Sequence, residues 1–303
     1  MAHRSHRKAP SPFWIYLAPG LIGFTLVVGI PFLMNIGISF SKWRGIGMPT
    51  FIGLKNYARL MSDEAFWHSL QNTLFFVMAM AVVPTIISLI IASILFDYIS
   101  QRFGQGWSSF FRAGYYLPQI LPISVAGVLW GWILNPHGVL NLILTATGLE
   151  SLTGNWLGDP NLALFALGFV MVWLQIGYSL VVFMSGLARV DPSLYEAAEL
   201  DGARASQRFW YVTLPALRPE IFVVGLTTTI AALKVFAPVF VLTNGGPDNA
   251  TLVPSYFSYY HFFSTVRIGY GAAIATAQTT ITIVLAMIFL WVQTRQTEGN
   301  AND

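Results

Sequence analysis

Lys234 is the only basic side chain well inside a long apolar stretch of this sequence. On a helix it shares one face with Thr227, Ile230 and Ala231. A charged group inside a membrane is costly, so we expect this face to line a cavity or a partner rather than lipid. The ammonium group could donate to the hydroxyl groups of a solute, or pair with a phosphate or carboxylate. In a purely structural alternative, Lys234 snorkels or bonds a carbonyl of a kink near Pro238.

A second polar face is formed by Gln175 and Tyr178, which stand three residues apart in the apolar stretch 162–187. This stretch and the one holding Lys234 flank the polar segment 190–219, so a movement of that segment would move both faces. Together the two faces predict the lining of a solute pathway. Its six candidate residues are Gln175, Tyr178, Thr227, Ile230, Ala231 and Lys234.

The sequence offers little for catalysis or metal binding. It contains no cysteine and no G-x-x-x-x-G-K-[ST] motif, so thiolate chemistry is excluded and ATP is not expected to bind this chain. An intramembrane protease would need Ser and His inside a span, and the segment 201–204 matches the D-G-x2-A-R motif of lipid-headgroup transferases only in part. The histidines stand singly in the tail or in outer loops, where we expect them to be solvated rather than metal ligands: His3, His6, His68, His137 and His261.

The composition is typical of an all-α membrane protein. Of the 303 residues, 55% are hydrophobic and 10% are charged, whereas soluble domains carry about 25% charged residues. Residues 1–303 are predicted to form one transmembrane domain, and the first apolar run is too long for a signal peptide. The segment 51–72 is amphipathic and is expected to lie along the outer interface. Six stretches can each cross a bilayer, which takes about 20 residues: 13–38, 72–97, 110–134, 162–187, 220–243 and 270–293.

The distribution of Lys and Arg predicts that both ends of the chain are cytoplasmic. In this orientation the inner side holds Arg4, Arg7, Lys8, Arg102, Arg112, Arg189, Arg204, Arg208, Arg218 and Arg295. The outer side holds only Lys42, Arg44, Lys55, Arg59 and Arg267. The basic residues lie mostly between apolar runs, so the net charge of +3 gives no reason to expect a nucleic-acid partner. Only Asp97 approaches a span as an acidic group, which disfavours a gradient-driven transporter.

The polar segment 190–219 is predicted to hold a short helix, a turn and a second short helix on the cytoplasmic side. Asp191 is a suitable N-cap for the first helix, and Gly202 can end that helix in a left-handed turn. Pro215 and Pro219 mark where the second helix must stop or kink.

The spacing within this segment resembles the signature E-A-A-x3-G-x9-I-x-L-P of ABC importer permeases, with Val212 in place of the usual Ile. The resemblance implies a coupling helix seated in a cleft of a separate ATPase subunit, which would bind ATP and Mg²⁺ in place of this chain. Leu194 beside the two alanines forms the contact stripe that such docking needs. The residues that match the signature are Glu196, Ala197, Ala198, Gly202, Leu214 and Pro215.

Other segments resemble the binding-protein-dependent carbohydrate permeases, the group that includes the maltose and glycerol-3-phosphate importers. They are GLKNY (53–57), FW (66–67), NT (72–73), FR (111–112), LP (117–118), NWLGDP (155–160) and TNGGP (243–247). The resemblance covers residues 13–293, and the chain lacks the large outer domain inserted in the maltose permease. By similarity to that permease, the sugar would be held by the two polar faces, although the side chains there differ.

The resemblance implies a type I permease fold with six transmembrane helices in a bacterial inner membrane. It implies a transport subunit rather than an enzyme, which imports a sugar or polyol-like solute by alternating access. Its partners would be membrane lipid, a second homologous permease, two ATPase subunits and an extracytoplasmic solute-binding protein. An anionic solute such as a glycerophosphate is the alternative, followed by a gradient-driven transporter or an intramembrane enzyme.

Overall fold

The computed structural model describes residues 13–302, and for residues 13–15, 97, 100, 101, 105 and 296–302 it describes the backbone only. The predictions made for the basic N-terminal residues, for His3 and His6 and for the Asp97 carboxylate lie outside this part. Four described helices are long and apolar enough to cross a membrane: Tyr16–Ser39, Glu64–Phe96, Pro160–Leu187 and Ile268–Arg295. Two bent helix pairs raise the number to six if each pair crosses as one span. One pair contains most of the predicted third span, and the other joins residues 205–216 of the polar segment to the helix Arg218–Leu233.

The first two spans are joined by a hairpin and a short helix. The first span comprises α1 (Phe13–Phe24), the π-helical segment η1 (Thr25–Gly29) and α2 (Ile30–Ser39), followed by the paired strands β1 (Ser41–Lys42) and β2 (Thr50–Phe51). After α3 (Lys55–Met61), the second span comprises α4 (Glu64–Val77), η2 (Met78–Val82), α5 (Val83–Ser93) and η3 (Ile94–Ile99).

The second span begins earlier than predicted. Asp63 caps α4 by accepting a hydrogen bond from the Ala65 N–H at 3.1 Å, so the helix starts at Glu64 rather than near residue 72. The segment 51–72 is therefore not one interfacial element, because its second half belongs to the spanning helix.

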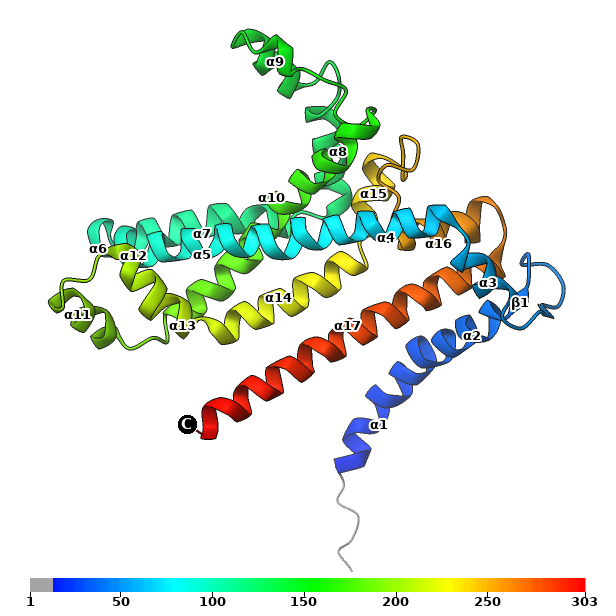
Figure 1. Ribbon diagram of the computed structural model, residues 1–303, viewed down its shortest axis with the longest axis horizontal. Helices are drawn as coiled ribbons and strands as arrows, with labels where there is room; N and C mark the ends of the chain where they lie inside the picture. The colour runs from blue at the N-terminus through cyan, green and yellow to red at the C-terminus, as the bar shows by residue number, and fades with distance from the viewer. Residues whose placement is uncertain (1–12, 303) are drawn as a thin grey trace, which may run out of the picture.

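The predicted third span, 110–134, is bent. After α6 (Ser100–Phe103), α7 (Gln105–Ile120) meets α8 (Ile123–Ile133) at an angle of 96°. Pro122 explains the bend because it lacks an N–H and holds Leu121 in an extended conformation, with φ −66° and ψ 131°. A lobe follows, predicted to lie on the outer side, formed by α9 (Val139–Ala146) and the 3₁₀ turn η4 (Glu150–Leu152), and α9 stands away from the bundle (Figure 1).

The polar segment contains α11 (Pro192–Leu200), α12 (Ala205–Arg208), the π-helical η5 (Phe209–Thr213) and α13 (Leu214–Ala216). The next helix, α14 (Arg218–Leu233), departs at 69°. The predicted fifth span, 220–243, is not continuous, because α14 ends at Leu233 and a separate helix, α15 (Ala237–Leu242), follows. In an unbroken helix the ring of Pro238 would clash with the carbonyl of Lys234 and leave that carbonyl without its donor.

Two side chains satisfy backbone carbonyls at this break. Buried Gln278, on α17 (Ile268–Asn302), donates to the Leu233 carbonyl at 2.8 Å. Ser255, on α16 (Pro254–Tyr259), donates to the Val235 carbonyl. The π-helical η6 (Tyr260–Ser264) links α16 to α17. Since an unpaired backbone group is expensive in a membrane, these bonds fix α16 and α17 to the C-terminal end of α14.

The central helix is α10 (Pro160–Leu187), the most buried of the four long helices. One core cluster joins its first half to α4, α8 and α15, and a second joins its second half to α5 and α14. Gly177 lets α7 cross closely, because a Cβ at this position would lie 2.4 Å from the carbonyl oxygen of Tyr115. The helix thus holds both candidate faces in one packed unit.

Replacing Gln278 with leucine should lower the free energy of unfolding in detergent by about 1–3 kcal/mol, because the Leu233 carbonyl loses its donor. Thermal unfolding followed by tryptophan fluorescence measures the change. Thr280→Val is the matched control, since the exposed Thr280 hydroxyl bonds only the carbonyl of Thr276 on its own helix. Equal stability of the two variants would contradict the role assigned to Gln278.

Candidate functional site

The helix α11 lies at the opposite end of the molecule from α3 and β1 (Figure 1). Its predicted contact stripe is open to a partner. Leu194 exposes 53% of its surface, Glu196 and Ala197 are exposed, and Ala198 is half-buried. The chain therefore presents small and charged side chains on an accessible helix.

The start and the end of α11 follow the predicted local rules. Asp191 accepts a hydrogen bond from the Ser193 N–H at 2.9 Å, and the backbone N–H and hydroxyl of Ser193 hold the pKa of the Asp191 carboxyl below its usual range. Gly202 adopts φ +75°, the left-handed conformation expected after the helix. Half-buried Leu214 and exposed Pro215 lie in α13, so Pro215 does not end the helix, and the bend comes after Ala216.

Tyr195 anchors α11 to the bundle, and the sequence analysis missed it. Its side chain is buried, with its ring 5.7 Å from that of Phe96 and its hydroxyl 3.0 Å from Thr213 Oγ1. The available signal was a large aromatic residue directly before Glu196, on a different face from the contact stripe. The contact connects α11 both to the second span and to the helix that precedes α14.

Two ion pairs stabilise the polar segment, one within it and one across its ends, and both were missed. Arg208 pairs with Glu199 across the turn that follows α11. Arg189, just after α10, pairs with buried Glu220 in the first turn of α14. The second pair links the inner ends of the two helices that carry the candidate pathway residues.

The two polar faces predicted to line a pathway meet in the structure. The Tyr178 hydroxyl lies 3.1 Å from Thr227 Oγ1, which joins α10 to α14. Gln175 and Tyr178 are half-buried on α10. On α14, Thr227 and Ala231 are exposed and Ile230 is half-buried.

Lys234 forms the exposed C-terminal cap of α14. The helix dipole favours a cation at this position. The break carbonyls of Leu233 and Val235 already have donors in Gln278 and Ser255, so the Lys234 ammonium is not what satisfies them. Among the side chains that the structure describes, the ammonium group has neither a hydrogen-bond partner nor an ion-pair partner, so it is not hydrogen-bonded to Gln175.

His261 is not solvated, which corrects the expectation for the loop histidines. It is buried, with its ring centroid 4.7 Å from that of Phe257 and 4.9 Å from that of Tyr270. Burial, together with the charges of Arg59 and Arg267, lowers the pKa of His261 to about 4. The ring is therefore neutral near pH 7 and serves as part of an outer aromatic core.

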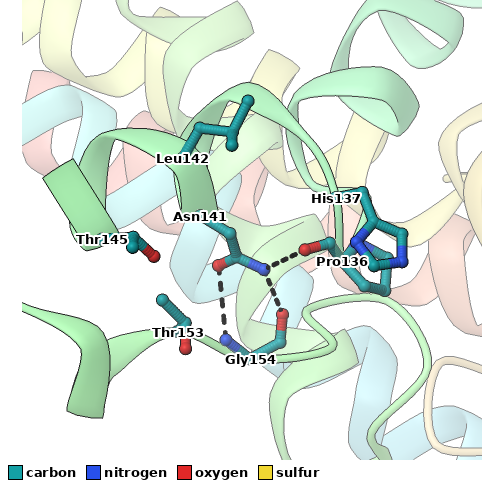
Figure 2. A pocket seen from close by; sticks show the side chains of 7 residues that line it. All are labelled: Pro136, His137, Asn141, Leu142, Thr145, Thr153 and Gly154. Atoms are coloured by element: carbon teal, nitrogen blue, oxygen red, sulfur yellow. Dashed lines mark hydrogen bonds between the residues drawn. The ribbon is translucent and has the colours of Figure 1, made fainter.

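An open cleft of about 390 Å³ lies on the outer lobe, and none of the candidate pathway residues lines it. Asn141 organises its floor (Figure 2). The side-chain amide donates to the carbonyls of Pro136 at 2.9 Å and Gly154 at 2.8 Å, and its oxygen accepts from the Gly154 N–H and from Trp156 Nε1. These bonds are all made within the chain, so Asn141 holds the lobe together rather than offering itself to a ligand.

Comparison with known proteins identifies the class to which this site belongs. Residues 106–298 match the family described as the binding-protein-dependent transport system inner membrane component. A probable ABC transporter permease, YurN of Bacillus subtilis (strain 168), is 36% identical over 277 residues, which cover 91% of this chain and 93% of the relative. The chain belongs to this family and is a membrane-spanning transport subunit rather than an enzyme.

Other relatives carry more specific names. The lactose transport system permease protein LacF of Rhizobium radiobacter is 30% identical over 278 residues, which cover 91% of each chain. The probable starch degradation products transport system permease protein AmyD of Thermoanaerobacterium thermosulfurigenes is 33% identical over 288 residues, which cover 94% of this chain and 95% of the relative.

The fold recurs in the crystal structure of a bacterial ABC transporter involved in the import of the acidic polysaccharide alginate. The TM-score is 0.78 at 22% identity, over 93% of this chain and 95% of the other. This likeness confirms the type I permease fold that the sequence predicted.

Replacing Gly202 with valine should raise the rate of trypsin cleavage after Arg204 about fivefold to thirtyfold, because a side chain at φ +75° costs about 1–2 kcal/mol and opens the turn. A Cβ at residue 202 would meet nothing within 4 Å, so the effect comes from the backbone alone. Gly202→Asn is the control, since Asn tolerates the left-handed region. Equal cleavage rates for the two variants would refute the assigned strain.

Proposed function

We propose that this chain is the permease subunit of an ABC importer that moves a sugar or polyol-like solute into the cytoplasm by alternating access. The contact between Tyr178 and Thr227 supports this most directly, because it joins the two helices between which the α11 segment is inserted. A displacement of α11 would act on α10 and α14 together. The two polar faces would then open first outward and then inward.

The energy would come from partner subunits. The exposed stripe around Glu196 would enter a cleft of an ATPase subunit, and two such subunits would bind ATP and Mg²⁺. A second, homologous permease would complete the pathway, since this chain supplies only one wall. A solute-binding protein would deliver the solute from outside, in keeping with the family description. In this arrangement α11 and both termini lie in the cytoplasm of a bacterial cell, and the spans lie in its inner membrane.

A neutral polyhydroxy solute suits the lining groups. Tyr178 and Thr227 offer hydroxyls, Gln175 offers an amide, and Lys234 adds one cation. Such groups donate to and accept from the hydroxyls of a sugar, while Ile230 and Ala231 can pack against its carbon atoms. The relatives named for lactose and for starch degradation products favour the same solute class.

Replacing Glu196 with lysine should lower the solute-dependent ATPase rate of the reconstituted complex at least about tenfold, because reversing a charge in a docked interface costs about 2–5 kcal/mol. Membrane insertion should be unaffected, as the residue is exposed. Glu150→Lys makes the same charge change on the outer lobe and should leave the rate unchanged. A normal ATPase rate in an assembled Glu196→Lys complex would exclude the docking role.

Replacing Lys234 with methionine should raise the KM of solute uptake about tenfold, because a hydrogen bond from a charged donor contributes about 1.5–3 kcal/mol. Uptake of radiolabelled lactose, maltotriose and N,N′-diacetylchitobiose into proteoliposomes that contain the whole complex measures the effect. Lys55→Met, at an exposed outer position, is the control. An unchanged KM would assign Lys234 to the structure of the helix end.

A further inference from the structure

Five aromatic rings follow one another in contact from the break after α14 to the outer surface. The inner rings, Phe236 and Phe240, stack at 5.4 Å, and Tyr259 lies 5.3 Å from each of them. Phe263 continues the series at 4.9 Å from Tyr259, and Tyr256 packs 6.3 Å from Phe236. We name these five residues the aromatic ladder.

Exposure along the aromatic ladder is greatest at its outer end. Phe263 exposes 71% of its surface and Phe240 37%, whereas Phe236, Tyr256 and Tyr259 are half-buried. The rings thus form a continuous surface that is most open at its outer end and remains accessible toward its inner end.

Apart from Tyr256, which also packs against two core clusters, the aromatic ladder is not what anchors α16 and η6. The opposite face of these helices holds Phe257 and His261, both buried against Tyr270. The Tyr270 hydroxyl donates to Asp63 at 2.6 Å, and the Arg59 guanidinium lies 4.2 Å from the Tyr270 ring centre. One aromatic face therefore fixes the element to the bundle, and the other is left partly exposed.

The inner end of the aromatic ladder lies beside Lys234. Phe236 follows Lys234 by two residues, and Ser255 ties the start of α16 to the Val235 carbonyl between them. An ammonium group with no counter-ion is costly in lipid, so we expect the surface around Lys234 to face water, a cavity or protein. The aromatic ladder connects that surface to the outside.

We propose that the aromatic ladder is a binding track along which the sugar rings of the solute pass from the outer face to Lys234. This inference rests on the proposed function. The C–H faces of a pyranose ring pack against aromatic faces, and the hydroxyls of Tyr256 and Tyr259 can bond its edges. Because successive rings touch, a sugar can move from one to the next without leaving aromatic contact.

Replacing Phe236, Phe240 or Phe263 singly with leucine tests the track in the complete complex with its binding protein and ATPases. Each variant should raise the KM for uptake of the sugar that the wild type accepts, from lactose, maltotriose and N,N′-diacetylchitobiose, by about threefold to tenfold. The ATPase rate at saturating sugar should stay at the wild-type level. The corresponding tyrosine variants, which keep a ring, should restore most of the affinity.

Phe51→Leu is the matched control, because Phe51 is an outer phenylalanine with 77% exposure that does not belong to the aromatic ladder. Wild-type KM values in all three leucine variants would overturn the track while leaving the importer intact. Loss of complex assembly in Phe263→Leu but not in Phe51→Leu would also overturn it, by assigning the ring to a partner subunit. A wild-type complex that takes up none of the three sugars would instead refute the proposed function, and the track with it.

Discussion

A helix that breaks inside a membrane must find new donors for the carbonyls it frees, and the outer half of this chain is arranged around that requirement. Gln278 and Ser255 supply the donors at the end of α14, and these bonds hold α17 and α16 against that end. Because neighbouring elements satisfy the backbone, the Lys234 side chain is free for another role. The break that Pro238 imposes therefore sets the position of the cation, of α15 and of the aromatic rings on α16.

The inner half depends on a different connection, from a surface helix to the same α14. Tyr195 and Thr213 join α11 to the turn before α14, and Arg189 ties the first turn of α14 to the end of α10. With 16 residues, α14 is about 24 Å long, so a tilt of about 10° at its inner end would displace its outer end by about 4 Å. A small movement of α11 is thus enough to change the surroundings of Lys234.

Features governed by neighbouring residues were predictable from the sequence. The Asp191 cap and the Gly202 turn follow from local rules, and the structure shows both of them. The fifth span was predicted to run to residue 243 because its residues are mostly apolar. Hydropathy does not reveal a helix break whose free carbonyls accept hydrogen bonds from side chains distant in the sequence. Gln278 lies 45 residues from the carbonyl it satisfies, and Glu220 lies 31 residues from Arg189. Such pairs, like the burial of His261, depend on packing that no local pattern encodes.

Exposure alone does not distinguish a pathway from a lipid-facing surface in this chain. The most apolar part of the first span, Tyr16–Ser39, has no buried residue. Its polar Asn35 donates a hydrogen bond to Thr276 Oγ1 at 3.0 Å. An apolar helix of this kind can face lipid without cost, so its exposure calls for no partner. The exposed face of α14 differs because it ends in Lys234, whereas the Thr227 hydroxyl on it already donates to the Val223 carbonyl at 2.7 Å. Lipid does not solvate the Lys234 ammonium group well, so we expect the end of this face to meet water, a solute or another protein.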